Sequence, residues 1–318
     1  MPKLLRTKKV YFYVALLFPL VLSSEAFLFL KTFGFRGLPQ LFNRNILFAT
    51  KLDEKQHLTV ILPAYNESRR IGDTLRLYHE FLKTQLQQCN SDILVVDDGS
   101  TDGTARVVQD FAPANPVNVP VNCISLPCNQ GKGAAVAFGI DHVARNQVKD
   151  SNNCLVLVAD ADASADIQSL PGVFDKLQDI SQGGNVPAIV VGRRTYAESL
   201  SPSRMVLRWG FRTAVQILCG DMGVSDTQCG FKLMTLTAAQ RLYSNLHLRG
   251  WSHDVEVLYR AKELGIPVAE QAVQWQDKEG SKLVTSPGGT IGASLTMLVE
   301  IAQLKFFYSV GIWKVSEK

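Results

Sequence analysis

The chain has 318 residues, of which 46% are hydrophobic and 19% are charged, a composition that supplies a hydrophobic core and excludes an intrinsically disordered protein. The 33 Lys and Arg residues against 29 Asp and Glu give a formal net charge of only +4, so we expect no nucleic-acid partner. The six Cys residues are scattered without a C-x-x-C pair, which argues against a structural zinc site or a disulfide framework and favours a reducing compartment.

An apolar run occupies residues 10–30, interrupted only by Pro19 and Glu25. A helix of this length just spans the hydrocarbon core of a bilayer, which is about 30 Å thick. We therefore predict that residues 1–56 form a membrane anchor and a polar linker. Two alternatives stay open. A signal peptide is one, because 24–26 has the small-x-small pattern of a cleavage site. A re-entrant or interfacial segment is the other, because a carboxylate at the bilayer centre is costly.

From residue 58 the sequence alternates between short apolar runs and segments with helical periodicity. Apolar runs of four or five residues bounded by Pro, Gly or Asp are typical of buried parallel strands. The runs lie at 58–62, 93–96, 123–126, 155–158 and 188–191. The helical segments lie at 68–86, 101–111, 131–145 and 167–180. This alternation predicts an open α/β sheet with its ligands at the carboxyl ends of the strands.

The pattern changes after Gly192. A helical segment with several Arg residues at 203–219 leads to a further helix and to a β-like run at 268–275. We interpret residues 57–285 as one domain. The remaining segment, 286–318, is apolar with few charges, which predicts amphipathic helices that lie on a membrane surface.

Acidic residues follow the first two predicted strands. The first strand ends in P-A-Y-N-E, which contains Pro63, Tyr65 and Glu67. The second ends in D-D-G-S-T-D, which begins with Asp97 and Asp98. Ser and Thr suit the start of a helix, but three carboxylates within six residues exceed what a helix cap needs. Like charges repel one another unless a ligand or a cation balances them, so this edge of the sheet is a candidate binding site.

The fourth strand is followed by D-A-D, with Asp160 and Asp162 pointing to the same side. Such a pair can share Mg²⁺ or Mn²⁺, hard cations that prefer oxygen ligands and keep water or substrate phosphates as the others. The helix after the third strand opens with N-Q-G-K-G, in which Lys132 supplies a positive charge. The spacings of a P-loop and of a dinucleotide-binding loop are absent, which argues against an NTPase and a dehydrogenase.

These motifs, in this order, resemble the family 2 inverting glycosyltransferases with the GT-A fold, from about residue 58 to residue 285. Motifs of the second half resemble those of the dolichyl-phosphate β-glucosyltransferases within that family. They are V-G-R-R at 191–194, D-T-Q-C-G-F-K at 226–232, W-S-H-D-V-E at 251–256 and E-G-S-K-L at 279–283. The resemblance implies a Rossmann-like mixed sheet flanked by helices. The predicted fold class is this α/β domain with an N-terminal membrane anchor helix and amphipathic C-terminal helices.

The resemblance also implies an activity, which is transfer of glucose from UDP-glucose to dolichyl phosphate with inversion. The product would be dolichyl β-D-glucosyl phosphate, a donor for N-glycan assembly. The residues implied to hold the nucleotide sugar are Pro63, Tyr65, Glu67, Asp97 or Asp98, Lys132 and Asp160. Mg²⁺ or Mn²⁺ on Asp160 and Asp162 would neutralise charge building on the leaving UDP.

The acceptor requires positive charge, because a phosphate monoester carries about −1.5 to −2 charges at neutral pH. Arg193, Arg194 and Arg204 have few acids near them in the sequence, and Arg pairs well with phosphate. The same cluster also suits an exposed basic face on anionic headgroups. The acceptor oxygen is already ionised, so no strong base is required. Whether Asp226 orients the acceptor, acts as a base or only caps a turn stays open.

Other functions fit part of the pattern. A polyprenyl-phosphate mannosyl- or N-acetylglucosaminyltransferase would use the same acceptor and another donor. A non-catalytic nucleotide-sugar binding protein would have only the binding site. A nucleotidyltransferase would show a different phosphate loop. The expected location is the endoplasmic reticulum membrane with the catalytic domain facing the cytosol, where a lipid bilayer is a partner. The four basic residues before residue 10 slightly favour a cytosolic N-terminus, which conflicts with that location if 10–30 spans the membrane. Homo-oligomerisation is left open.

Overall fold

A computed structural model describes residues 56–86, 89–114, 119–146, 153–196, 202–278 and 289–315. All of them lie in one compact unit, Phe48–Lys318. The predicted anchor at 10–30 lies outside these described residues. Within them, no helix combines the length and the apolar character that crossing a membrane requires.

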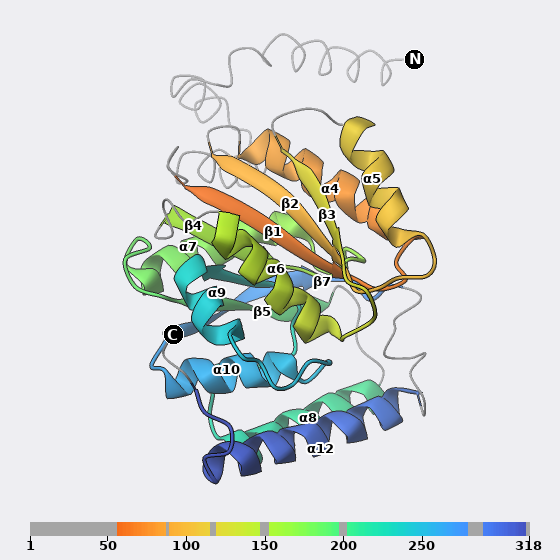
Figure 1. Cartoon of the computed structure of the whole chain (residues 1–318). Coiled ribbons are helices and arrows are strands. Elements are labelled where there is room, and N and C mark those ends of the chain that lie inside the picture. The colour runs from red at the N-terminus through yellow and green to blue at the C-terminus, as the bar shows by residue number, and fades with distance from the viewer. Residues whose placement is uncertain are drawn as a thin grey trace, which may run out of the picture. The chain divides into compact units, whose positions relative to one another are not determined.

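The described unit is built around a single seven-stranded sheet (Figure 1). The strands are β1 (His57–Ala64), β2 (Asn90–Asp97), β3 (Val121–Ser125), β4 (Cys154–Val158), β5 (Ile189–Tyr196), β6 (Lys232–Thr235) and β7 (Val268–Trp275). The helices are α4 (Ile71–Gln85), α5 (Thr104–Ala114), α6 (Lys132–Asn146), the 3₁₀ helix η2 (Ile167–Ser169), α7 (Leu170–Ser181), α8 (Pro202–Cys219), α9 (Leu236–Tyr243), α10 (His253–Glu263) and α12 (Gly289–Ser309).

The strand order is β3-β2-β1-β4-β6-β5-β7, and β6 runs antiparallel to both of its neighbours. The other pairs are parallel, so the carboxyl ends of β1, β2, β3 and β4 meet at one edge. The five predicted runs and the run at 268–275 are all strands, which confirms the α/β sheet. The strand β6 was not predicted. It has only four residues, K-L-M-T, and its first residue is a lysine, so no apolar run marks it.

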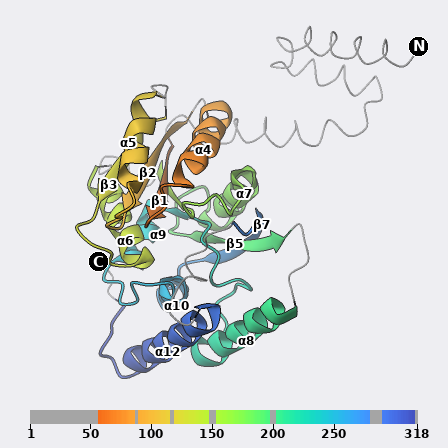
Figure 2. The ribbon, with the colours of Figure 1, turned by 90° about the vertical axis from the view of Figure 1, so that its right-hand side faces the viewer.

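Helices cover both faces of the sheet, with α4, α5 and α7 on one face and α6 and α9 on the other (Figures 1 and 2). Strands covered on both sides need apolar side chains on both sides, which explains the uninterrupted run C-L-V-L-V of β4. All five of its residues are buried. The sheet is therefore a rigid platform, and the loops at its carboxyl edge carry the polar motifs.

The helices α8 and α12 lie side by side, away from the sheet, in both views (Figures 1 and 2). One face of α12 buries Met297, Ile301 and Leu304. Its opposite face exposes Leu295, Val299 and Phe306, so it differs from the amphipathic pattern that we predicted for the C-terminal segment. Among the described residues of this segment, 289–315, α12 is the single helix, and it is apolar on both its buried and its exposed sides.

Candidate active site

Two loops at the carboxyl edge, 65–70 after β1 and 98–104 after β2, are joined by hydrogen bonds. The backbone N–H groups of Asn66, Glu67 and Ser68 donate to the side chains of Ser100, Thr104 and Asp102 at 2.8, 2.8 and 3.0 Å. Desolvation works against the charge on Asp102, but the hydrogen bonds from Thr104 and Ser68 together lower its pKa to about 2. The S-T-D-G-T part of the motif therefore holds the P-A-Y-N-E turn in place, while Tyr65 remains partly exposed.

The two acids that end β2 are buried and engage backbone N–H groups. Asp97 accepts from the N–H of Ser100 at 3.1 Å. Asp98 accepts from the N–H groups of Gln130 and Gly131, both at 2.8 Å, and thereby fixes the loop that precedes α6. Gly99, with a φ of +69°, lies so close to the backbone of Cys128 that a β-carbon would overlap it. These two acids, predicted to contact the nucleotide, thus also hold the loops together.

A first charged cluster, which we call the acidic cluster, consists of Glu67, Arg70, Lys132, Asp160 and Asp162. Arg70 donates to both carboxylate oxygens of Glu67, at 2.6 and 2.5 Å, and to Asp162 Oδ2 at 3.3 Å. The Nζ of Lys132 lies 2.5 Å from Asp160 Oδ1. Burial works against the charge on Lys132, but Asp160 outweighs it and raises the pKa of this lysine. The cluster joins the ends of β1 and β4 to the start of α6.

Two residues from other parts of the chain, Gly230 and Trp251, border the acidic cluster. A β-carbon at Gly230 would overlap the Asp160 carboxylate in its present position, so glycine at 230 leaves this carboxylate its place. The ammonium group of Lys132 also lies 5.4 Å from the centre of the Trp251 ring, within the range of a cation–π interaction. Sequence reasoning placed Lys132, Asp160 and Asp162 at this edge but missed Arg70. The only signal for Arg70 was its place directly after the P-A-Y-N-E turn.

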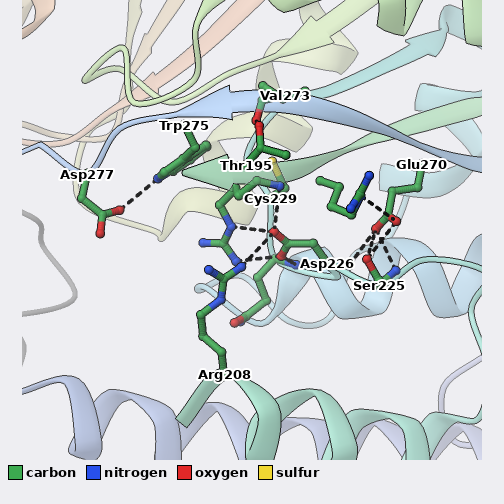
Figure 3. A network of polar contacts seen from close by, with 12 residues as sticks. Thr195, Arg208, Ser225, Asp226, Cys229, Glu270, Val273, Trp275 and Asp277 are labelled. Carbon is green, nitrogen blue, oxygen red and sulfur yellow. Dashed lines mark hydrogen bonds and ion pairs between the residues drawn. The ribbon is translucent and has the colours of Figure 1, made fainter. Parts of the chain in front are cut away.

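A second cluster, the basic cluster, consists of Arg193, Arg194, Arg208 and Asp226, of which Arg208 and Asp226 are labelled in Figure 3. Arg194 donates to Asp226 from Nε and from Nη2, both at 2.7 Å, and its guanidinium lies 5.4 Å from the centre of the Trp275 ring. Burial alone would raise the pKa of Asp226, but the hydrogen bonds and charge of Arg194 lower it. A buried carboxylate held in this way is a weak base and an effective anchor for Arg194.

Arg208 reaches the same carboxylate from α8, with Nη2 3.5 Å from Asp226 Oδ2 (Figure 3). Its guanidinium also lies 4.9 Å from the centre of the Tyr196 ring. Sequence reasoning assigned the equivalent charge on this helix to Arg204, whose side chain lies outside the described part of the structure. Arg208 follows Arg204 by one helical turn of α8, so in the sequence both arginines equally indicate a positive charge on this helix.

Arg193 lies in β5, and its side chain is 52% exposed to solvent. Its Nε lies 3.5 Å from Glu270 Oε2. Glu270 in turn accepts from the N–H of Ser225 at 2.7 Å and from the N–H of Asp226 at 2.9 Å. Glu270, which the sequence did not single out, therefore fixes the loop that carries Asp226 (Figure 3).

The W-S-H-D-V-E motif leads into α10, which begins at His253. The Trp251 ring of this motif lies against Lys132 of the acidic cluster. Asp254 is buried and accepts from Lys232 Nζ at 2.5 Å, with His253 Nε2 3.1 Å away. Glu256 is fully buried and accepts from the backbone N–H of Leu248 at 2.6 Å. Burial lowers the pKa of His253, which favours its neutral form in the interior.

The arrangement provides carboxylates at the ends of β1 and β4 and a group of three arginines on β5 and α8. Gly230, which faces Asp160, lies in the same short segment as Asp226. This segment connects the acidic cluster with the basic cluster. Chemically, the first can hold a cation and a diphosphate, and the second can hold an anionic acceptor.

The family model described as glycosyl transferase family 2 matches residues 59–242. A dolichyl-phosphate beta-glucosyltransferase of Dictyostelium discoideum is 36% identical over 269 residues, covering 81% of this chain and 77% of that protein. The Homo sapiens protein of the same name is 34% identical over 270 residues, covering 82% and 79%.

Solved structures share the fold at low sequence identity. Mannosyl-3-phosphoglycerate synthase from Rubrobacter xylanophilus superposes with a TM-score of 0.56 at 17% identity, covering 85% of this chain and 80% of that one. Glucosyl-3-phosphoglycerate synthase from Mycobacterium tuberculosis, solved with Mn²⁺, UDP-glucose and phosphoglyceric acid, gives a TM-score of 0.51 at 17% identity, covering 79% and 84%. The chain thus belongs to glycosyl transferase family 2 and, within it, to the family of the dolichyl-phosphate beta-glucosyltransferases.

Proposed function

We propose that this chain transfers glucose from UDP-glucose to dolichyl phosphate with inversion at the anomeric carbon, giving dolichyl β-D-glucosyl phosphate for N-glycan assembly. The names of its relatives supply the donor sugar and the acceptor. The observation that carries the proposal is the presence of an acidic cluster at the ends of β1 and β4 and a basic cluster on β5, joined by the segment from Asp226 to Gly230.

A divalent cation, Mg²⁺ or Mn²⁺, is part of the proposal. Among the described residues, no group of three or more His, Cys, Asp or Glu side chains forms a metal cage. Two carboxylates are nevertheless a suitable donor set for such a cation, because diphosphate oxygens and water complete its shell. Asp160 and Asp162 remain partly exposed, with 23% and 18% of their side-chain surface accessible. They would hold the cation, which when bound neutralises charge on the departing diphosphate.

The acceptor phosphate is assigned to Arg193 and Arg208. Both side chains are partly exposed, and both carry charge that is not fully matched by the carboxylate beside them at 3.5 Å. Arg194 is already paired with Asp226 through two hydrogen bonds. We therefore assign Arg194 and Asp226 to positioning the basic cluster. Arg204 stays a prediction for the same phosphate.

Catalysis then depends on alignment and charge. The acceptor oxygen is ionised at neutral pH, so it attacks the anomeric carbon without giving up a proton. Arg193 and Arg208 would orient this oxygen in line with the bond that breaks, and Lys132 and Arg70 would face the leaving diphosphate. Holding both substrates in this geometry supplies the larger part of the rate enhancement in such a reaction.

We also propose that the chain acts at a lipid bilayer, at the cytosolic side of the endoplasmic reticulum, where UDP-sugars are supplied. The exposed faces of α8 and α12 support the bilayer contact. They expose six large apolar side chains, which are Met205, Trp209, Ile217, Leu295, Val299 and Phe306. An exposed apolar surface of this kind on adjacent helices is typical of a membrane contact.

The test is transfer from labelled UDP-glucose to dolichyl phosphate by the full chain in detergent, with Mg²⁺, with Mn²⁺ and with EDTA. We expect a lipid-linked glucose in the presence of either metal and its loss with EDTA. Product from labelled GDP-mannose or UDP-N-acetylglucosamine alone would change the donor assignment. UDP binding without transfer from any of the three donors would contradict the enzyme and leave a binding protein.

A further inference from the structure

Each carboxylate proposed to hold the metal already contacts a cation of the chain. The Nζ of Lys132 lies 2.5 Å from Asp160 Oδ1, and Nη1 of Arg70 lies 3.3 Å from Asp162 Oδ2. The other oxygen of Asp162 accepts from the N–H of Ser164 at 3.0 Å. A divalent cation would use some of these same oxygens, so it must displace a positive group or share a carboxylate with it.

The two cations differ in how firmly they are held. Arg70 is fixed by two short hydrogen bonds to Glu67, besides its longer contact with Asp162. The ammonium of Lys132 is bonded to Asp160 and otherwise lies against the Trp251 ring. A lysine ammonium is a point charge on a flexible four-carbon stem, whereas the Arg fork is fixed by its planar geometry. Lys132 is therefore the group that can exchange partners.

The backbone that carries Lys132 is rigid. It is the first residue of α6, and the N–H of the next residue, Gly133, donates to the carbonyl oxygen of Arg249 at 2.7 Å. A β-carbon at Gly133 would overlap His253, so the helix start packs closely on the loop before α10. The side chain of Lys132 can turn while its α-carbon stays in place.

The charges of the acidic cluster determine whether a bound diphosphate helps or hinders the binding of a divalent cation. Three carboxylates face two cations, so the cluster attracts a divalent cation only weakly while Lys132 remains at Asp160. A bound diphosphate brings at least two further negative charges. It gives Lys132 new oxygens to pair with, and Asp160 then becomes available to the metal.

We propose that Lys132 competes with the divalent cation for Asp160, so that nucleotide diphosphate and metal bind cooperatively and neither binds tightly alone. This inference rests on the proposed function for the identity of both ligands. Coupling between two ligands is reciprocal, and it is typically about 5–150-fold in affinity. Lys132 thus couples the binding of the two ligands, in addition to the donor contact proposed for it.

The test measures Mn²⁺ affinity directly, with free Mn²⁺ followed by electron paramagnetic resonance in titrations of the full chain in detergent, with and without UDP. For Lys132→Met we expect Mn²⁺ without UDP to bind about tenfold more tightly than in the unaltered chain. We expect UDP to increase Mn²⁺ affinity much less in this variant. Lys132→Arg keeps the charge and should retain the coupling.

Lys83→Met is the matched control, because it removes the same charge from an exposed position at the far end of α4. Its Mn²⁺ and UDP affinities should equal those of the unaltered chain. Lys132→Gln is a second neutral variant, and thermal unfolding of each variant shows whether it is folded.

The inference is overturned if folded Lys132→Met or Lys132→Gln binds Mn²⁺ without UDP no more tightly than the unaltered chain. It is also overturned if these variants do not bind Mn²⁺ at all. Glucose transfer by the same preparation of the unaltered chain is measured separately. Transfer without the coupling overturns only this inference. Coupling without transfer overturns only the proposed function.

Discussion

Asp226 and Asp254 are both buried carboxylates, and each one faces a cation from another element. Asp226 anchors Arg194 beside the proposed acceptor site, whereas Asp254 balances Lys232 in the interior. In the proposed function, the same residue type therefore positions substrate-binding groups in one place and stabilises the interior in the other. Charge-assisted pairs of this kind are costly to break, because the partner left behind is then buried without a counter-charge.

We predict that Asp226→Asn lowers kcat/KM for dolichyl phosphate by about 10–100-fold, because Arg194 loses a charged partner worth about 1.5–3 kcal/mol. The acidic limb of the pH–rate profile should stay where it is, since the carboxylate does not accept the proton of the reaction. Initial rates at varied dolichyl phosphate and pH measure both effects. The exposed Asp179→Asn on α7 is the control. If Asp226 is the catalytic base instead, this limb shifts or disappears.

The pH dependence of stability should report Asp254. Burial alone would raise the pKa of Asp254, but His253, Lys232 and Lys132 lower it to about 2. The value in the unfolded chain is about 3.9. Because the folded value is the lower one, this carboxylate stabilises the fold above about pH 4, and the contribution is lost as the pH falls toward 2.

Urea unfolding between pH 2 and 7 measures that contribution. Asp254→Asn should lose this part of the pH dependence. Asp254→Ala should lower the free energy of unfolding by about 3–5 kcal/mol at pH 7, because Lys232 is left without its counter-charge. If the stability of Asp254→Asn falls with pH as it does in the unaltered chain, other carboxylates cause this pH dependence.

At the scale of elements, α12 is held to the domain by polar contacts as well as by apolar packing. The hydroxyl of Tyr308 donates to Glu256 at 2.9 Å, and Ser252 donates to Glu300 at 2.6 Å. The imidazole of His247 stacks on Trp313 with ring centres 4.2 Å apart. These contacts connect α12 and the residues after it to α10 and to the loop before α10, and that loop packs on the start of α6, where Lys132 is located.

Tyr308→Phe should lower the free energy of unfolding by about 1 kcal/mol, because Glu256 loses one of its donors while the aromatic packing is kept. Chemical denaturation monitored by circular dichroism measures the change. Ser309→Ala removes a hydroxyl from an exposed position of the same helix and should change little. An equal loss in both variants would indicate a general effect on α12 and not the buried contact.

At the scale of the whole molecule, the charged motifs and the largest group of exposed apolar side chains lie in different places. The charged motifs gather at the carboxyl edge of the sheet, and six of the exposed large apolar side chains lie on α8 and α12. Arg208 on α8 belongs to both regions, because its helix carries Trp209 on the apolar face. An acceptor with a lipid tail and a charged head would meet these two surfaces together.

The side chain of Trp209 is 70% exposed, and we predict that it inserts into lipid. In vesicles that contain brominated lipid, the tryptophan fluorescence of the reconstituted full chain should be quenched, and Trp209→Phe should remove a large part of this quenching. Trp251→Phe, near Lys132, is the control and should leave the quenched component in place. Equal quenching in the unaltered chain and in Trp209→Phe would place α8 away from the lipid.

Much of the site was readable from the order of its motifs. Glu67, Lys132, Asp160 and Asp162 were predicted at one sheet edge, and the structure brings them together. The pairing of Arg194 with Asp226 was not predicted, because the two residues are 32 positions apart and belong to different elements. Arg70, Arg208 and Glu270 were missed for the same reason, because the contacts that single them out join residues distant in the chain.

The sequence by itself determined the α/β alternation, the family and the acids at the strand ends, because these depend on local periodicity and on short motifs. Only the tertiary structure decided that β6 joins the sheet antiparallel and that Asp226 holds Arg194. It also decided that Lys132 contacts Asp160 and that α8 lies beside α12. Strand pairing, ion pairs and helix packing join residues that are distant in the chain, and their energies depend on burial and geometry that only the folded chain creates.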